Sequence, residues 1–191
     1  MFKKFLAVLC VVAIALGFSS PTISHASQVN DEYPPEVNVD KEQIEMAEKL
    51  SNYFEQDADG SVRFTADKET LMEMGISESD IELMTSTGPE EFSFDENKSE
   101  MQTYGFVGLH LELGPKVRAM NAVVAGAFAG GYIGWYTKQI AAAGPWGAGA
   151  AAAITASTAG VVGWAVNRSL QKVDVGVNIS YVSLSYTVKI P

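Results

Sequence analysis

The sequence predicts a mainly helical α+β fold: a small acidic helical region, then a strand, an apolar helical hairpin and a C-terminal strand or hairpin. Three observations support this prediction. Apolar residues recur at helical spacing through the acidic region after residue 40. Two helix-length apolar stretches rich in glycine and alanine, 116–143 and 146–170, are separated by Gly144-Pro145. Alternating apolar and polar residues, typical of strands, flank them at 103–113 and 173–190.

Residues 1–26 have the organisation of a secretory signal peptide. Two lysines precede an apolar core from Phe5 to Phe18, and Ser24-His25-Ala26 has the small residues of a cleavage site. We therefore expect Sec-type secretion to an extracellular or envelope-associated location, with a retained membrane anchor as the alternative. The single cysteine, Cys10, lies in this segment, so we expect no disulfide in the exported chain.

Charge divides the rest of the chain near residue 100. Residues 27–100 carry 21 acidic and 5 basic side chains, a net charge of −16, whereas residues 101–191 carry 2 acidic and 6 basic ones, a net charge of +4. We expect 27–100 to be an acidic pro-region or an N-terminal helical domain, and 101–191 to be a cationic hydrophobic region. The basic residues are too dispersed to indicate nucleic acid as a partner.

The first predicted helix of the acidic region follows a polar linker at 27–40. Asp40 is the expected N-cap, and apolar residues continue at helical spacing as far as Phe54. The sequence DADG at 57–60 predicts a turn, and SVRFT at 61–65 predicts a short strand.

Two shorter helices are expected after this turn. Thr65 is the predicted N-cap of one helix, which Gly75 ends, and the segment Ser77–Asp80 fits a capping box at the start of the next. Residues 86–100 show no strong periodicity and are expected to form an acidic loop.

Residues 55–66 partly match a calcium-binding EF-hand loop. Asp57, Asp59 and Gly60 fit three of its positions, but Glu55 occupies the first position and Ala66 replaces the bidentate glutamate. We therefore expect a hairpin turn here, and we predict no metal site and no cofactor.

Catalytic residues are not predicted. His110 is the only histidine outside the signal segment, and it lies in an alternating strand whose apolar face carries Val107, Leu109, Leu111 and Leu113. No Ser/His/Asp or Cys/His combination is supported by spacing around it. We expect a histidine that faces solvent or has a structural partner, and a protein that is not an enzyme.

Small residues recur every four positions on both helices of the hairpin 116–170, and we expect these positions to be sites of helix packing. Ridges of this kind let two helix backbones approach closely, in lipid as well as in water. On the first helix the ridge comprises Ala122, Gly126, Gly130 and Gly134, and on the second it comprises Ala148, Ala152, Ala156 and Gly160.

Each helix of the hairpin also approaches the length of about 20 residues that spans a bilayer. Aromatic and basic side chains gather near the helix ends, as suits a lipid–water interface: Lys116, Arg118, Trp135, Tyr136, Lys138, Trp146, Trp164, Arg168 and Lys172. We therefore expect an anionic bacterial bilayer as a partner. Because alanine and glycine make the hydrophobicity marginal, a tightly packed hairpin inside a soluble globule stays open as the alternative.

The alternation at 173–190 changes phase part-way along. Val173 and Val175 begin one apolar face, whereas Val188 and Ile190 belong to the opposite face of a continuous strand. A bulge or a tight turn near Tyr181-Val182 would restore a single apolar face.

The Gly126-Gly130-Gly134 zipper, its flanking aromatic and basic residues and the acidic region before it resemble the layout of secreted bacteriocin-like, pore-forming antimicrobial proteins of Gram-positive bacteria. The chain lacks the YGNGV box, the disulfide and the double-glycine leader site of the small pediocin-like type, so no subfamily is assigned.

This resemblance implies an exported precursor whose hairpin permeabilises bacterial membranes and associates with further copies of itself. Neither an immunity protein nor a processing protease is identified. The acidic region would mask the basic ends through loose, salt-screened attraction, or it would be a solvated helical domain of a stable two-part protein. The alternative function is a non-toxic envelope-associated or membrane-anchored structural protein.

Overall fold

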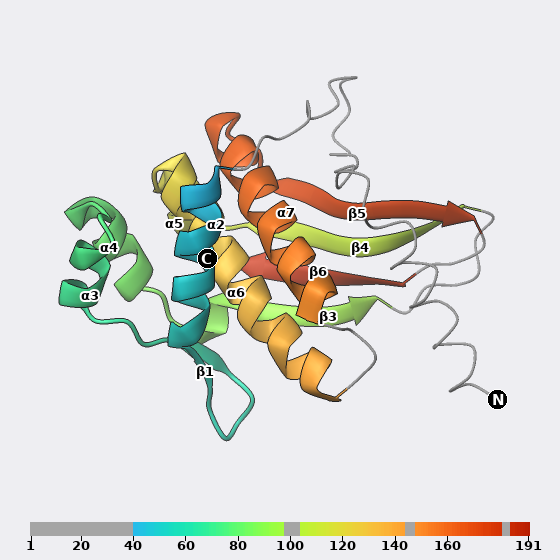
Figure 1. The fold of residues 1–191 in the computed structure, drawn as a ribbon, viewed down its shortest axis with the longest axis horizontal. Coiled ribbons are helices and arrows are strands. Elements are labelled where there is room, and N and C mark those ends of the chain that lie inside the picture. The colour runs from blue at the N-terminus through green and yellow to red at the C-terminus, as the bar shows by residue number, and fades with distance from the viewer. Residues whose placement is uncertain (1–39, 98–103, 144–147, 181–183) are drawn as a thin grey trace.

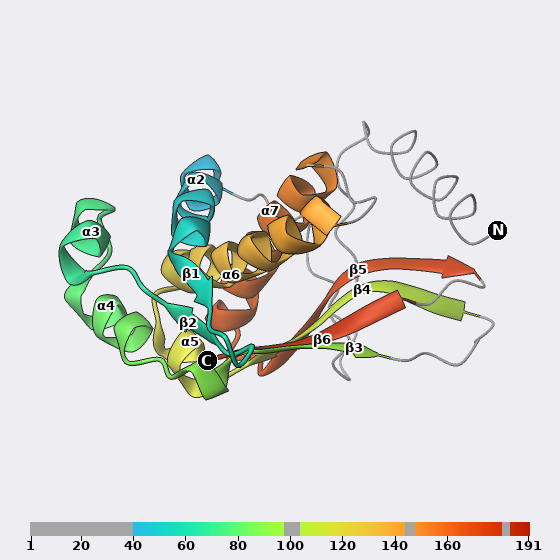
Figure 2. The ribbon, with the colours of Figure 1, turned by 90° about the horizontal axis from the view of Figure 1, so that it is seen from below.

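The computed structural model describes residues 40–97, 104–143, 148–180 and 184–191, so the predicted signal peptide lies outside the described residues. They form three layers (Figures 1 and 2): helix α2 (Lys41–Leu50), a hairpin of α6 (Ala122–Ala143) and α7 (Ala148–Asn167), and a four-stranded sheet. The prediction of a mainly helical α+β fold is confirmed.

Helix α2 begins where the sequence predicts. The carboxylate of Asp40 accepts a hydrogen bond from the Glu42 backbone N–H at 3.1 Å. The helix ends earlier than expected, at Leu50, and a 3₁₀ turn, η1 (Ser51–Tyr53), follows. Phe54 therefore starts strand β1 (Phe54–Gln56), which pairs antiparallel with β2 (Val62–Phe64) across the predicted turn.

The helices α3 (Lys68–Glu73) and α4 (Glu78–Thr85) correspond to the two shorter predicted helices. Thr65 was the wrong N-cap for α3, because its backbone N–H and hydroxyl both bond to the Tyr53 carbonyl and extend the β1–β2 pairing. Asp67 caps α3 instead, accepting from the Thr70 N–H at 2.7 Å. Ser77 caps α4 as predicted.

The acidic loop expected at 86–100 is partly wrong. The residues after Gly88 form a 3₁₀ turn, η2 (Pro89–Glu91), and then strand β3 (Ser93–Asn97). Strand β3 pairs antiparallel with β6 (Leu184–Ile190), and Phe94 lies opposite Val188. Since the pairing partner lies almost a hundred residues away, local periodicity alone does not mark this segment as a strand.

The four strands lie in the order β3-β6-β4-β5, where β4 is Tyr104–Leu113 and β5 is Lys172–Ser180. Strand β6 runs parallel to β4, and the other neighbouring pairs are antiparallel. The predicted 173–190 segment is therefore two strands on opposite sides of β4. Both present one buried apolar face, carrying Val173 and Val175 on β5 and Val188 and Ile190 on β6. The expected bulge at 181–182 lies outside the described residues.

The single helix expected from 116 to 143 is divided. Helix α5 (Pro115–Ala119) ends at Met120, whose ψ of 161° is extended. The Asn121 N–H donates to the carboxylate of Asp80 at 2.9 Å, and the Asn121 side chain accepts from the Val123 N–H at 3.0 Å. Asn121 thus starts a new helix, α6, and Asp80 of the acidic region holds that start in place.

One apolar core joins the two regions that differ in charge. Phe54 of β1 lies within 5.0–5.8 Å, between ring centroids, of Phe64, Phe92, Phe128 and Tyr132. The last two belong to α6. The acidic region, residues 40–97, therefore contributes aromatic side chains to the same core as the hairpin.

Candidate functional site: the hairpin and its acidic cover

The hairpin of α6 and α7 is enclosed by protein on both of its broad sides. Helix α2 lies on one side and the sheet on the other (Figure 2). Every residue of 124–135 on α6 is buried. A helix that is apolar all round needs an apolar environment all round. In this structure residues 40–97, called the acidic cover below, supply a large part of that environment.

The glycine ridge of α6 is in close contact with α7. A Cβ atom added to Gly126 would lie 2.2 Å from the Ala159 carbonyl oxygen, and one added to Gly134 would lie 2.8 Å from the Thr155 hydroxyl. At Gly130 the added atom would lie 3.0 Å from the Ala159 Cβ. Each of the three predicted glycines therefore has a neighbour where a side chain would be.

The α7 surface that meets this ridge differs from the predicted one. It is formed by Thr155, Ala159 and Gly163, where a Cβ on Gly163 would lie 2.9 Å from the Ala122 carbonyl oxygen. The predicted positions Ala156 and Gly160 each follow a residue of this row by one position, and the side chain of the predicted Ala152 lies outside the described residues. Because small residues occupy several faces of α7, spacing alone does not identify the contacting row.

Helix α2 packs against the same region of α6 from outside. A Cβ added to Gly130 would lie 3.2 Å from the Ala47 Cβ, and one added to Gly131 would lie 3.0 Å from the Leu50 Cβ. The sequence analysis did not identify Gly131 as a packing position. The glycines of α6 thus allow two helices, α7 and α2, to approach α6 closely.

Gln43 of α2 reaches the junction of all three helices. Its side-chain amide donates to the Ala159 carbonyl of α7 at 3.1 Å and to the Val123 carbonyl of α6 at 3.4 Å. Gln43 is 7% exposed. The sequence analysis missed it, although the spacing of Gln43, Ala47 and Leu50 on one helical face contains the signal.

Basic residues predicted at a membrane interface have protein partners in this form. Lys116 donates to Glu91 at 2.6 Å and to the Ser86 carbonyl at 2.8 Å, both in the acidic cover. The Lys116 ammonium holds the pKa of Glu91 below its usual value. Lys138 donates to the Ser51 hydroxyl at 2.7 Å.

Two further basic residues donate hydrogen bonds to other residues of the C-terminal region, 101–191. Arg118 donates through Nε to the carbonyls of Leu113 and Gly114 at 3.1 and 3.2 Å. Lys172 donates to Glu112 at 2.7 Å, and this bond lowers the pKa of Glu112.

The aromatic residues predicted at the same interface pack against protein. Trp135 is 7% exposed, and Tyr136 stacks on Phe94 with ring centroids 3.6 Å apart. Burial raises the pKa of Tyr136. The Arg168 guanidinium lies 4.9 Å from the ring centroid of Trp164. Trp146 lies outside the described residues.

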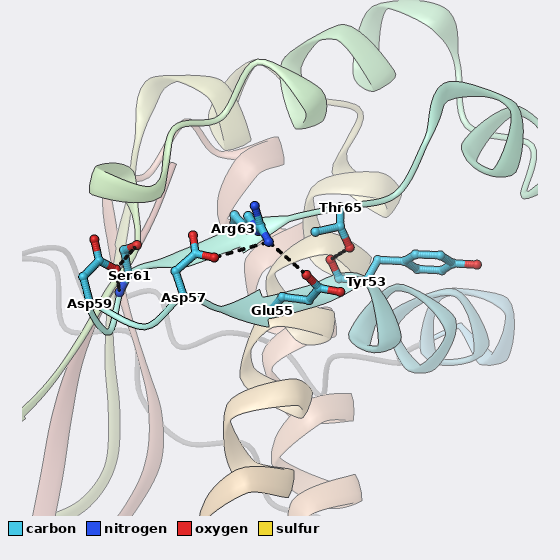
Figure 3. A network of polar contacts seen from close by, with 7 residues as sticks. All are labelled: Tyr53, Glu55, Asp57, Asp59, Ser61, Arg63 and Thr65. Atoms are coloured by element: carbon cyan, nitrogen blue, oxygen red, sulfur yellow. Dashed lines mark hydrogen bonds and ion pairs between the residues drawn. The ribbon is translucent and has the colours of Figure 1, made fainter.

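The calcium-like segment forms a hairpin stabilised by its own side chains. Arg63 lies between Glu55 and Asp57, at 3.4 and 3.3 Å from their carboxylates (Figure 3). Asp59 accepts from the Ser61 hydroxyl at 2.7 Å, which lowers the pKa of Asp59. Within the described ranges, no three His, Cys, Asp or Glu residues are grouped so that they could hold a metal ion.

His110 lies on the sheet face opposite the hairpin. Its Nδ1 is 2.7 Å from the Asp174 carboxylate, and its ring lies 4.8 Å, between centroids, from Phe106. This is the structural partner that the sequence analysis allowed for.

None of the helices in the described part of the chain combines the length and the apolar character needed to cross a membrane. Comparisons with protein-family models, with curated proteins and with solved structures find no match to this chain.

Proposed function

We propose that this chain is an exported bacteriocin-like precursor whose hairpin, once uncovered, permeabilises anionic bacterial membranes. The observation that carries the proposal is the burial of an apolar, glycine-ridged hairpin under an acidic cover. This cover also binds Lys138 of α6 through Ser51 and Lys116 of the preceding α5 through Glu91. Uncovering the hairpin would expose apolar surface and release cationic side chains at the same time.

The closed form and the uncovered form differ in the charge that they present to a membrane. The acidic cover carries 17 acidic and 4 basic residues, a net charge of −13, so anionic lipid repels it. Lys116 and Lys138, freed from the cover, would bind anionic headgroups while the apolar faces of α6 and α7 enter the bilayer.

The contacts of the cover support a helical domain of a stable two-part protein more than a loose electrostatic mask, the two alternatives that the sequence left open. Phe54 and Phe92 are 3% and 7% exposed and pack against α6. Salt alone does not separate surfaces joined in this way, so the hairpin is uncovered by a conformational opening or by removal of the cover.

The test compares a folded and an unfolded route to the membrane. Residues 27–191 are added to dye-loaded vesicles either folded or by rapid dilution from urea, which presents the hairpin before the cover has closed. We expect strong leakage only by the second route, and more from phosphatidylglycerol-containing vesicles than from pure phosphatidylcholine vesicles.

Gly130→Leu tests the glycine mechanism by the same dilution, which does not require the variant to fold in water. It should abolish leakage, whereas Val123→Leu, at a position 44% exposed on the same helix, should leak like the wild type. Unchanged leakage by Gly130→Leu would remove the glycine-packing mechanism. Absence of wild-type leakage by both routes, together with no inhibition of related bacteria, would favour the non-toxic envelope protein.

A further inference from the structure

Helix α2 places few large apolar side chains against the hairpin. Its buried residues are Gln43, Ala47 and Leu50, of which Leu50 is the one large apolar side chain, and Met46 is partly buried against the same core. The adjoining segments of the cover are attached by the rings of Phe54 and Phe92. Elements that bury little apolar surface open at lower free energy than the core.

The surface under α2 is the closely packed part of the hairpin. It includes Gly130 and Gly131 of α6, and Gln43 bonds across it to carbonyls of both α6 and α7. Movement of α2 would therefore expose the glycine face of the hairpin.

We propose that α2 is an autoinhibitory helix that leaves the hairpin before the rest of the cover opens, and that Gln43 holds it closed. Its biological role rests on the proposed membrane function, whereas the motion itself does not. Anionic lipid would favour the open state, because it binds the hairpin surface that α2 covers in the closed state.

Gln43→Glu tests the role of Gln43 with a side chain of nearly equal shape. At neutral pH a carboxylate there faces two carbonyl oxygens and loses both donated bonds, in a site with little water. In hydrogen exchange measured by mass spectrometry on residues 27–191, we expect at least about tenfold faster exchange in 41–50. Exchange in β4, β5 and β6 should stay as in the wild type.

Glu48→Gln, an exposed change on the solvent-facing side of α2, is the matched control and should exchange like the wild type. The proposal is overturned if 41–50 exchanges together with the sheet in the wild type, which would mean that α2 opens only when the whole fold does. It is also overturned if Gln43→Glu leaves the exchange of α2 unchanged.

Vesicle leakage by the same variants separates this inference from the proposed function. Fast exchange of α2 in Gln43→Glu without leakage would support the autoinhibitory motion and count against membrane permeabilisation. Leakage above background that is equal for the folded wild type and folded Gln43→Glu would support permeabilisation and overturn the role of α2.

Discussion

At Gly126 three helices approach so closely that hydrogen is the largest substituent the site accommodates. An added Cβ would lie 2.1 Å from the Gln43 amide nitrogen and 2.2 Å from the Ala159 carbonyl oxygen. The amide can rotate away, but the carbonyl belongs to the backbone of α7. The site therefore tolerates a methyl group only if α7 shifts.

Gly126→Ala should lower the free energy of unfolding by about 1–3 kcal/mol, the usual range for overpacking in a core. Val123→Ala, three residues away at an exposed position, should change it by less than about 0.5 kcal/mol. Urea unfolding of residues 27–191 followed by tryptophan fluorescence measures both. Equal stability of Gly126→Ala and wild type would mean that α7 moves away at little cost.

Among the elements, α5 is joined to the acidic cover by a charged pair. Lys116 of α5 and Glu91 of η2 are 2.6 Å apart, and their side chains are 25% and 27% exposed. The Glu91 carboxylate also accepts from the Gly88 N–H at 2.8 Å. This second bond keeps the carboxylate in place beside the lysine.

Glu91→Gln should reveal a dependence of stability on pH. The pKa of Glu91 is lowered from 4.5 in the folded state, so the pair stabilises the fold above that value, and this contribution is lost as the pH falls through the folded-state pKa. The free energy of unfolding of the wild type should exceed that of Glu91→Gln by up to about 1 kcal/mol at pH 7, and this difference should vanish in strong acid. Urea unfolding across this pH range measures it, with exposed Glu90→Gln as control; a pH-independent difference would contradict the assignment.

At the scale of the whole molecule, residues 101–191 lack the rings and the strand that complete their core. Phe54, Phe92 and strand β3 all come from the acidic region. We expect residues 101–191 produced alone to aggregate or bind lipid, and residues 27–100 added during refolding to return them to a soluble complex. Sedimentation with and without residues 27–100 measures this. A soluble, cooperatively unfolding 101–191 fragment would show that the cover is dispensable for folding.

Local signals in the sequence were enough to locate the caps at Asp40 and Ser77, the apolar face of β4 and the two long helices. Features set by distant contacts were missed. The break at Asn121 depends on Asp80, 41 residues earlier, and β3 depends on pairing with β6. On α7 the abundance of alanine and glycine conceals which row meets α6. The membrane interpretation is based on helix length, small-residue ridges, and aromatic and basic residues near the helix ends, and a buried helical hairpin can have all of these features.

Strand β6 lies between β3 and β4 although it follows both of them in the chain, so the sheet closes late in folding. A chain that is synthesised amino end first delivers β3, β4 and the hairpin before β6. Backbone bonds from Gly114 to Ile190 and from Val117 to Pro191, at 2.7 and 2.6 Å, also wait for that strand. Contacts so distant in sequence form slowly. The hairpin is therefore complete before the sheet beside it can close, and during that interval its sheet-facing side lacks its packing partner.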